Sequence, residues 1–369
     1  MSARIVVFGT TGYTGRLVSE ALVREGARPV LAARNAKRLD ALAAELGGLE
    51  TAVADVAQPD TVRGLVSRGD VLVSTVGPFT RWGAAAVEAA VASGAHYLDS
   101  TGEPPFIREV FERWGGAAQS AGCGLLTAFG YDFVPGNLAG ALALERAGAN
   151  ATSVHVGYFF SGSGGIRGAA SGGTLASLAG IMLEPQPVFR DGRVQSERAA
   201  ARVRSFTSGG KKLTGVSIGA SEHFALPREQ PGLREVDVYL GWFGPASRGV
   251  QVFSAGGELV SKVPGAREGY GKLAERFIKG STGGPGADAR SKTGSLIFAE
   301  ARDASGRVLA EVELRGTNGY TFTGDILAWG ARRIAEHGLE GTGALGPVEG
   351  FGLRALEAGC AEVGLRSAN

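Results

Sequence analysis

The hydrophobic pattern of the first 145 residues alternates regularly between two kinds of segment. Short, almost continuous apolar runs are typical of strands buried on both faces, and the amphipathic stretches between them are typical of helices. The expected strands are residues 5–8, 28–33, 51–54, 71–76, 95–98 and 124–128, and the expected helices are 16–25, 36–46, 59–68, 84–93 and 106–121. This alternation predicts a doubly wound parallel α/β sheet, a Rossmann domain, over residues 1–145.

The pattern changes after residue 145. Strands that alternate between apolar and polar positions are expected at 152–160, 203–206, 215–224, 235–242, 296–302 and 308–315, and helices at 174–183, 247–263, 322–336 and 350–361. Glycine-rich stretches at 162–173 and 280–289 indicate flexible connections. We therefore expect an α+β substrate or oligomerisation domain on an antiparallel sheet over residues 146–320. Residues 321–369 would add helices that pack back on the first domain.

The first strand runs directly into a glycine-rich turn, RIVVFGTTGYTG, at residues 4–15. The first glycine of such a turn lets the chain leave the strand sharply, the second admits a pyrophosphate and the third lets the next helix pack closely. The order strand, turn, helix favours a nucleotide site over a simple turn in another α/β protein. The residues expected to contact the cofactor here are Gly9, Thr10, Thr11, Gly12, Tyr13, Thr14 and Gly15.

The residue after the second strand usually separates NAD from NADP. An acid in this place binds the ribose 2′-hydroxyl of NAD, whereas a cation accepts the 2′-phosphate of NADP. This chain has Arg34 there, followed by Lys37 and Arg38, and no acid between Gly26 and Ala36. NADP is therefore the expected cofactor, and Arg34 and Arg38 are expected to bind it. The alternative for Lys37 and Arg38 is that they only form the solvated face of the next helix.

Two later strand ends belong to the same expected site. Asp55 follows the third strand, where an acid commonly meets the adenine amino group, but it is equally suited to cap the helix expected at 59–68. The fourth strand ends in Val76, Gly77, Pro78 and Phe79. Ligands bind outside the carboxyl ends of parallel strands, so this turn should lie against the ribose and nicotinamide.

Composition narrows the class of protein. The chain has 369 residues, of which 44% are hydrophobic and 20% are charged, and a formal net charge of +2, as expected for a soluble globular protein. It contains no lysine/arginine-rich tract for nucleic acid and no apolar stretch long enough to span a membrane. The two cysteines, Cys123 and Cys360, suggest neither a disulfide framework nor a zinc site. We expect no signal peptide, and a cytoplasmic location is consistent with both expectations.

Several segments resemble a known family. The segments FGTTGYTG, LAARN, STVGPF, GAHYLDSTGE and TAFGYDFVPGN, in this order, resemble the saccharopine dehydrogenase-like oxidoreductases, nearest the short stand-alone members that include trans-acting enoyl reductases beside polyketide synthases. SGGTLAS at 171–177 is similar to a motif of that branch, and GYTFTGDILAWGARRI is similar less specifically. The resemblance implies an NADP-dependent oxidoreductase with a Rossmann domain and an α+β substrate domain.

Some familiar chemistries are disfavoured by the residues. None of the seven tyrosines is followed four residues later by lysine, as short-chain carbonyl reductases require. Cys123, between two glycines at the start of an apolar strand, suits a buried structural thiol better than a nucleophile. The four histidines show no metal-ligand spacing, so we expect no metal.

Hydride transfer from the nicotinamide to an electron-poor carbon needs little more than a positioned proton donor. Tyr131 and Asp132, after the sixth strand, are the expected catalytic residues, since a phenol at its ordinary pKa keeps its proton at neutral pH. Glu103 and Asp99 are second candidates, and Asp132 has the alternative of bonding to the backbone at 135–136. Apolar residues suited to a lipophilic pocket, a dimer interface or the core are Phe159, Phe160, Met182, Leu183, Trp242 and Phe243.

The expected reaction is therefore NADPH-dependent reduction of a conjugated C=C bond in a lipophilic or polyketide-type substrate. A homodimer and a carrier-protein or synthase partner are compatible with this expectation. Two alternatives stay open: reduction of an amino-acid-type imine, with Arg167, Arg202 and Arg204 as the available carboxylate clamp, and a redox-inactive NADP sensor.

Overall fold

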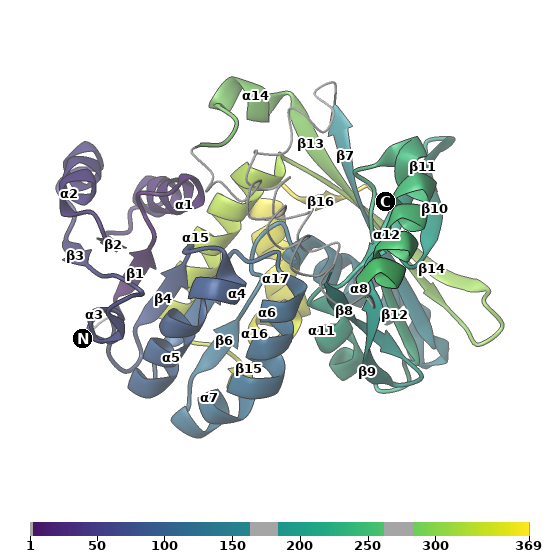
Figure 1. Cartoon of the computed structure of the whole chain (residues 1–369), viewed down its shortest axis with the longest axis horizontal. Helices are drawn as coiled ribbons and strands as arrows, with labels where there is room; N and C mark the ends of the chain where they lie inside the picture. Colours follow the sequence, from purple (N-terminus) through teal and green to yellow (C-terminus); the bar gives the residue numbers. More distant parts are fainter. Residues whose placement is uncertain (1–2, 163–183, 262–282, 369) are drawn as a thin grey trace. The chain divides into compact units, whose positions relative to one another are not determined.

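The computed structural model describes residues 3–162, 184–261 and 283–368, with side chains up to residue 255 in the second range. The chain divides into two compact units (Figure 1). The first consists of Met1–Leu138 and Gly319–Leu365, and the second of Ala139–Asn318 and Arg366–Asn369. The three-part division at residues 145 and 320 stays a prediction.

The first unit is built on a seven-stranded sheet in which every pair of neighbours is parallel. Its strands are β1 (Ile5–Phe8), β2 (Val30–Ala33), β3 (Thr51–Val53), β4 (Val71–Ser74), β5 (His96–Asp99), β6 (Gly124–Leu126) and β15 (Gly343–Ala344). The order β15-β6-β5-β4-β1-β2-β3 reverses its direction of growth between β1 and β4. This is the doubly wound order predicted from the sequence, and its ligand position lies at that reversal.

Helices connect and cover these strands. They are α1 (Tyr13–Arg24), α2 (Ala36–Glu45), α3 (Pro59–Arg63), α4 (Phe79–Trp82), α5 (Ala84–Ser93), α6 (Pro104–Glu109), α7 (Gly115–Ala121), α15 (Gly319–His337), α16 (Pro347–Phe351) and α17 (Leu353–Glu362). Helix α8 (Val134–Ala147) begins in this unit and continues into the second, since the division falls after Leu138. The single helix predicted over 106–121 is instead two α-helices separated by a π-helical turn at Val110–Trp114. The helix predicted over 59–68 ends early, at Arg63.

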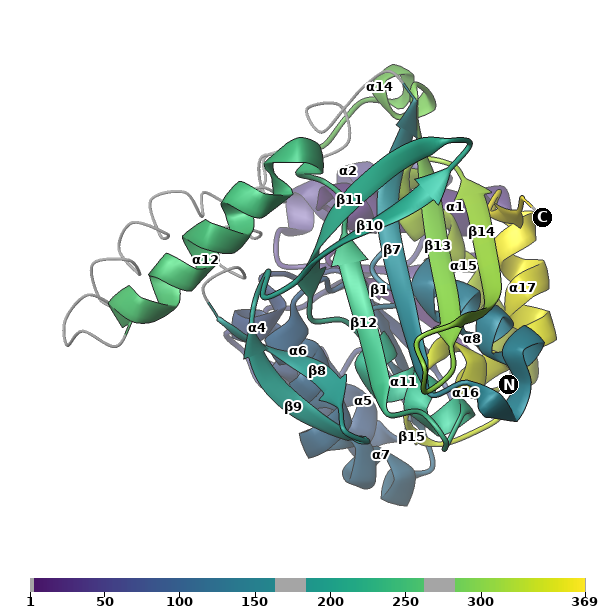
Figure 2. The same cartoon turned by 90° about the vertical axis from the view of Figure 1, so that its right-hand side faces the viewer.

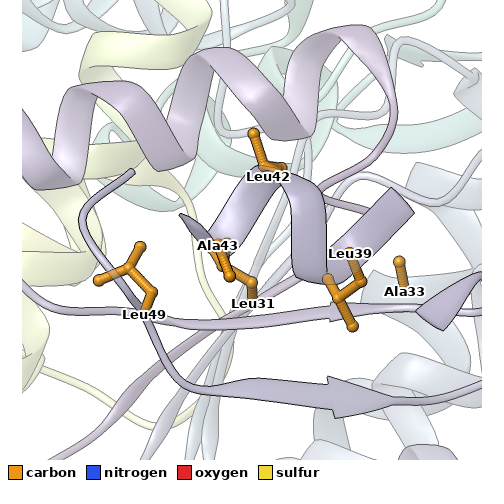
Figure 3. Close-up of a cluster of buried hydrophobic side chains, with 6 residues drawn as sticks. All are labelled: Leu31, Ala33, Leu39, Leu42, Ala43 and Leu49. Carbon is orange, nitrogen blue, oxygen red and sulfur yellow. The ribbon is translucent and has the colours of Figure 1, made fainter. Parts of the chain in front are cut away.

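An apolar cluster fixes α2 on β2, as Figure 3 shows. Leu39, Leu42 and Ala43 lie three and four positions apart, which places them on one helix face. Burying each leucine contributes about 1.5–3 kcal/mol. The cluster therefore holds the end of β2, which Arg34 follows directly, and the helix α2, which contains Arg38. Its members are Leu31, Ala33, Leu39, Leu42, Ala43 and Leu49.

Helix α15 packs against α1 from a distant part of the chain. Glycine at 324 permits close approach, because a Cβ there would lie 3.0 Å from the Cβ of Leu17. The Arg24 guanidinium donates to Asp325 at 2.6 Å, and the rings of Tyr13 and Tyr320 meet edge to face at 5.2 Å. The helix that begins at the glycine turn is thus held by residues some 300 positions later, as the Arg24–Asp325 separation of 301 shows.

The second unit is built on a mixed, mainly antiparallel sheet of nine strands (Figure 2). Its strands are β7 (Ser153–Gly162), β8 (Pro185–Arg190), β9 (Arg193–Arg198), β10 (Val203–Ser208), β11 (Lys211–Ile218), β12 (Glu235–Leu240), β13 (Thr293–Arg302), β14 (Val308–Gly316) and β16 (Arg366–Ser367). The main path runs β10-β11-β12-β7-β13-β14-β16, with β8 paired to β12 and β9. Among the described strands of this second sheet, only the β12–β7 pair is parallel.

Besides the greater part of α8, three α-helices of this unit are described: α11 (Glu222–Glu229), α12 (Ser247–Ser261) and α14 (Ala287–Ser291). The strand predicted over 215–224 was wrong in its second half, since the strand ends at Ile218 and α11 begins at Glu222. The hairpin β8–β9 was not predicted, because β8 contains two prolines and proline is uncommon within strands. The predicted loop at 162–173 (beyond Gly162), helix at 174–183 and motif at 171–177 lie outside the described residues.

None of the helices described in either unit combines the length and the apolar character that crossing a bilayer requires.

Candidate nucleotide and catalytic site

The glycine turn after β1 is closed tightly on itself. Gly9 has a φ of +94°, which a residue with a side chain rarely adopts, and its carbonyl accepts the Gly12 amide at 2.9 Å. A Cβ at Gly15 would lie 2.3 Å from the Gly9 carbonyl oxygen. The first and third glycines are therefore required by the turn itself, whereas a Cβ at Gly12 would meet only that oxygen, at 3.2 Å.

The threonines and the tyrosine of the turn have different surroundings. Thr10 is fully buried, and its hydroxyl donates to the Ala32 carbonyl at 3.3 Å, which ties the turn to β2. Tyr13 faces Tyr320, and Thr14 is half-buried in the first turn of α1. The turn is thus anchored on the neighbouring strand and on α15.

The N-terminus of α1 is suited to an anion. Its N-cap is the exposed Gly12, which has no capping side chain, and the first turn carries no acidic residue. Amide groups at a helix N-terminus carry partial positive charge and bind phosphate when no side chain occupies them.

The cations after β2 are exposed at the end of that strand. Arg34 is exposed and has no hydrogen bond or ion pair within the described ranges. Asn35 caps α2 by accepting the Arg38 amide at 3.0 Å, and this places Arg38 in the first turn of the helix. The Arg38 guanidinium reaches back and donates to the Thr11 carbonyl at 3.2 Å, so it lies against the glycine turn. Lys37 is also exposed.

Asp55 is engaged in a local turn. Its carboxylate accepts the Ala57 amide at 2.9 Å, and its backbone amide donates to the Thr61 hydroxyl at 3.0 Å. The N-cap of α3 is Gln58, so Asp55 does not cap that helix. Its second carboxylate oxygen has no hydrogen bond among the described residues, and contact with an adenine amino group stays a prediction.

The turn after β4 touches the turn after β1. A Cβ at Gly9 would lie 2.7 Å from the Thr75 hydroxyl and 3.0 Å from Val76, so the two turns are adjacent. Gly77 and Pro78 are exposed and joined by a cis peptide bond, and Phe79 is buried against Phe106.

Glu103 holds the segment that follows this turn. Its carboxylate accepts the backbone amides of Phe79 and Thr80 at 2.8 and 2.9 Å, and the Thr80 hydroxyl at 2.7 Å. Glu103 therefore fixes the start of α4, and its candidate role in proton donation stays a prediction. Sequence reasoning missed these hydrogen bonds because the partners are 23 and 24 positions away.

Asp99 at the end of β5 is fully buried, and both of its carboxylate oxygens accept hydrogen bonds. It accepts the amides of Thr101 and Ala128 at 2.8 and 2.9 Å, and the Thr127 hydroxyl at 2.8 Å. Burial raises the pKa of this carboxyl to about 6, although its hydrogen bonds act in the opposite direction. It joins the ends of β5 and β6 through these hydrogen bonds, and its candidate role in proton donation stays a prediction.

Tyr131 and Asp132 follow β6 in the same unit. The Tyr131 ring lies against Gly319, and its backbone amide donates to the Thr323 hydroxyl at 3.0 Å. Burial, and then the charge of Asp132, raises the pKa of this phenol above its ordinary value, which differs from the ordinary pKa assumed from the sequence. The phenol therefore keeps its proton firmly.

The Asp132 carboxylate is partly buried and has no hydrogen-bond partner among the described residues. It does not bond to the backbone at 135–136, which was the alternative considered from the sequence. One of its oxygens lies where a Cβ of Gly102 would be 3.1 Å away. Burial alone raises the pKa of Asp132 to about 6, so this carboxyl exchanges a proton close to neutral pH.

The second unit contains a network of partly buried charges around the buried Asp237. Arg202 pairs with Glu197 and Asp237, and Arg204 pairs with Glu300 at 2.5 Å. Both arginines offered as a carboxylate clamp are thus already engaged, and Arg167 lies outside the described residues. In this network His155, Glu235 and Asp237 lie close enough to share an ion.

A cation fits that histidine and carboxylate cluster poorly. Arg190 pairs with both carboxylates, and Arg202 pairs with Asp237 as well. Burial, and next the charge of Arg204, lowers the pKa of His155 to about 4. The arginines already supply the positive charge that an ion would bring.

The apolar residues expected to line a pocket are partly separated. Phe159 is buried in an aromatic cluster with Phe206 and Phe298. Phe160 instead packs against Trp242, with ring centres 5.2 Å apart. Phe243 is half-buried, and Met182 and Leu183 lie outside the described residues.

These features of the first unit together define its class. Three of its features fit a dinucleotide with a phosphate on its ribose. They are the turn that a side chain at Gly9 or Gly15 would obstruct, the uncapped N-terminus of α1 and the exposed Arg34. The first unit is thus a Rossmann domain of the type that binds NADP.

Comparison with known proteins finds a family that is similar to part of this domain. Residues 5–123 match the family described as the saccharopine dehydrogenase NADP binding domain. The resemblance predicted from the sequence is confirmed, and NADP is the cofactor that the family binds.

Relatives from mycobacteria share this part of the chain. A trans-acting enoyl reductase of Mycobacterium leprae is 38% identical over 140 residues, which are 36% of this chain and 34% of the relative. A Mycobacterium tuberculosis protein, which carries that name provisionally, is 36% identical over 186 residues, or 48% of this chain and 44% of the relative. The match thus spans less than half the length of these relatives.

The whole chain has a counterpart among solved structures. Saccharopine dehydrogenase (L-Glu forming) from Saccharomyces cerevisiae, in its apo form, aligns over 99% of both chains with a TM-score of 0.61 at 13% identity. This likeness shows the fold, a Rossmann domain with a second sheet domain, and confirms the predicted fold class.

Proposed function

We propose that this protein is an NADPH-dependent reductase of a conjugated C=C bond in a lipophilic or polyketide-type substrate. The observation that carries the proposal is the similarity, at 36–38% identity, to proteins named trans-acting enoyl reductases. The arginine pairs of the second unit favour it further, since two of the three candidate clamp residues for an amino-acid-type imine are already engaged.

NADPH, when bound, supplies the hydride. In this proposal the glycine turn and the N-terminus of α1 bind its pyrophosphate, and Arg34 and Arg38 bind its 2′-phosphate. Glu103 acts indirectly, because it fixes the backbone after the β4 turn, where the ribose and nicotinamide are expected.

Asp132 and Tyr131 have complementary proposed roles. Hydride addition to a β-carbon leaves negative charge on the carbonyl oxygen, which needs a hydrogen-bond donor, and the α-carbon then needs a proton. A phenol with a raised pKa suits the first task because it stays protonated. A carboxyl with a pKa of about 6 suits the second because it gains and loses its proton near neutral pH.

The test offers the protein a panel of enones, cyclic imines and ketones with NADPH deuterated at the transferring C4 position. We expect deuterium at the β-carbon of an enone. Deuterium only at an imine or carbonyl carbon would replace the proposal by the corresponding reductase, and no transfer to any acceptor despite NADPH binding would favour the sensor.

Variants separate the two proposed roles. Tyr131→Phe should lower turnover by roughly 10²-fold or more without changing NADPH affinity, and Asp132→Asn should flatten the pH profile near 6. Tyr320→Phe is the matched control, because it removes the same hydroxyl group and keeps the ring contact with Tyr13. Equal losses in Tyr131→Phe and Tyr320→Phe would contradict a specific role for Tyr131.

A further inference from the structure

An open cavity of about 850 Å³ lies within the second unit, between strands β7, β10 and β11 on one side and helix α12 on the other. This volume falls within the range of small-molecule sites. All of its lining residues belong to this unit, so the cavity is described without reference to the nucleotide domain.

The inner wall of the cavity is apolar and firmly packed. Phe159 and Leu213 form part of this wall, and behind them lies an aromatic cluster in which Phe206 contacts Phe159 edge to face at 5.7 Å. Phe159 is held by neighbours and is only 3% exposed. The outer wall includes Val252 of α12, whose side chain is largely exposed.

Three polar side chains of the lining already form hydrogen bonds within the protein. The hydroxyl groups of Ser205 and Thr214 bond to one another at 2.9 Å. The Gln251 amide donates to the Ala201 carbonyl at 2.8 Å. These groups therefore make little demand for a polar ligand.

Two cations at the cavity have no such partners. Lys212 on β11 and Arg248 on α12 both line the cavity and are exposed. Neither has a hydrogen bond or an ion pair with any residue in the described ranges. The lining thus presents unpaired positive charge beside an apolar wall, and no acidic residue belongs to it.

We propose that this cavity binds a single-chain amphiphile with an anionic head, a carboxylate or a phosphate. The alkyl chain lies along Phe159, Leu213 and Val252, and the head pairs with Lys212 and Arg248. A neutral lipid would leave both cations unpaired, and a polyanion would have only these two cations with which to pair. The proposal concerns equilibrium binding in the absence of NADPH, so it is independent of the proposed reductase activity.

Calorimetric titration of the whole protein tests this site. Decanoate and decyl phosphate, below their micelle concentrations, represent the two sources of the anionic head, and decanol and inorganic phosphate lack one part each. We expect one molecule of decanoate or decyl phosphate to bind per chain, decanol to bind on the order of tenfold more weakly, and inorganic phosphate alone not to bind. No binding of either anionic amphiphile at about 1 mM would overturn the proposal, because a dissociation constant above that value is too weak to define a site.

The variants locate the site on the protein surface without disturbing the core. Lys212→Ala with Arg248→Ala should weaken binding on the order of tenfold, since exposed ion pairs contribute up to about fivefold each. The control pair Lys211→Ala with Arg193→Ala makes the same change of charge at exposed residues outside the cavity. Equal weakening by both pairs would mean a general charge effect and would refute the site.

A second pair of variants tests the alkyl-chain region. Val252→Trp should obstruct the cavity and weaken decanoate binding, whereas Phe253→Trp, at the next and equally exposed residue of α12, lies outside the lining and should not. Unchanged binding in Val252→Trp would place the chain elsewhere and overturn the proposal.

Discussion

Replacing Asp132 by asparagine should stabilise the protein above neutral pH. The folded-state pKa of this carboxyl is about 6, against 3.8 for an unperturbed aspartic acid side chain, and the cause of the shift is burial. Because the folded pKa is the higher one, the folded state binds the proton more tightly. The free energy of unfolding therefore falls as pH rises from about 4 to about 6, and the ionised carboxylate is a cost above that range.

The magnitude follows from the shift. About two pKa units correspond to about 3 kcal/mol, at 1.36 kcal/mol per unit, as an upper value. Asparagine has nearly the same shape and no charge, and the carboxylate has no hydrogen bond among the described residues for it to break. Asp132→Asn should thus raise the free energy of unfolding by up to about 3 kcal/mol at pH 8 and leave it nearly unchanged at pH 4.

The matched control is Asp99, whose pKa is also raised to about 6. Its carboxylate accepts three hydrogen bonds, so Asp99→Ala leaves two buried amides without a partner and should destabilise the protein by about 2–4 kcal/mol. Asp132→Ala should not destabilise it at pH 8. Urea unfolding of the unaltered protein and these three variants at pH 4 and pH 8 makes the comparison.

A loss of stability in Asp132→Asn at pH 8, or an equal effect at both pH values, would refute the reasoning. The expected gain has a bearing on function, because a charge retained at a cost in stability is typical of a residue that serves a reaction.

Three further predictions concern the cofactor site. Arg34→Asp should weaken NADPH binding tenfold or more in a fluorescence titration, since a charge-assisted bond contributes about 1.5–3 kcal/mol, and equal affinity of the unaltered protein for NADPH and NADH would contradict this. Gly12→Val should abolish NADPH binding but leave the circular dichroism spectrum native, because Gly12 has a φ of −84° and only one close neighbour. Glu103→Gln should lower the free energy of unfolding by about 1–3 kcal/mol, since one amide oxygen replaces two carboxylate oxygens that cap α4, and an unchanged urea midpoint would count against that role.

The cofactor-binding turn could be predicted from the sequence because its requirements are local. Gly9 needs a positive φ and Gly15 needs to be without a Cβ, and both demands arise from residues within the same short segment. Parallel strands buried on both faces are likewise visible as apolar runs.

The features that sequence reasoning missed depend on distant residues. The role of Glu103 requires two strand ends to be neighbours in space, and the lack of partners around Asp132 among the described residues is a property of its folded surroundings. The strand predicted through Phe224 continued an apolar pattern that short helices also produce.

The packing of α15 on α1 has a consequence for biosynthesis. The nucleotide unit is discontinuous, since Gly319–Leu365 completes what Met1–Leu138 begins, and β15 supplies its last strand. A ribosome must therefore synthesise strands β7 to β14 of the second sheet before Tyr320 can reach Tyr13. During that interval the nascent N-terminal segment exposes the apolar face of α1 and the unpaired edge of β6, and it would benefit from a chaperone.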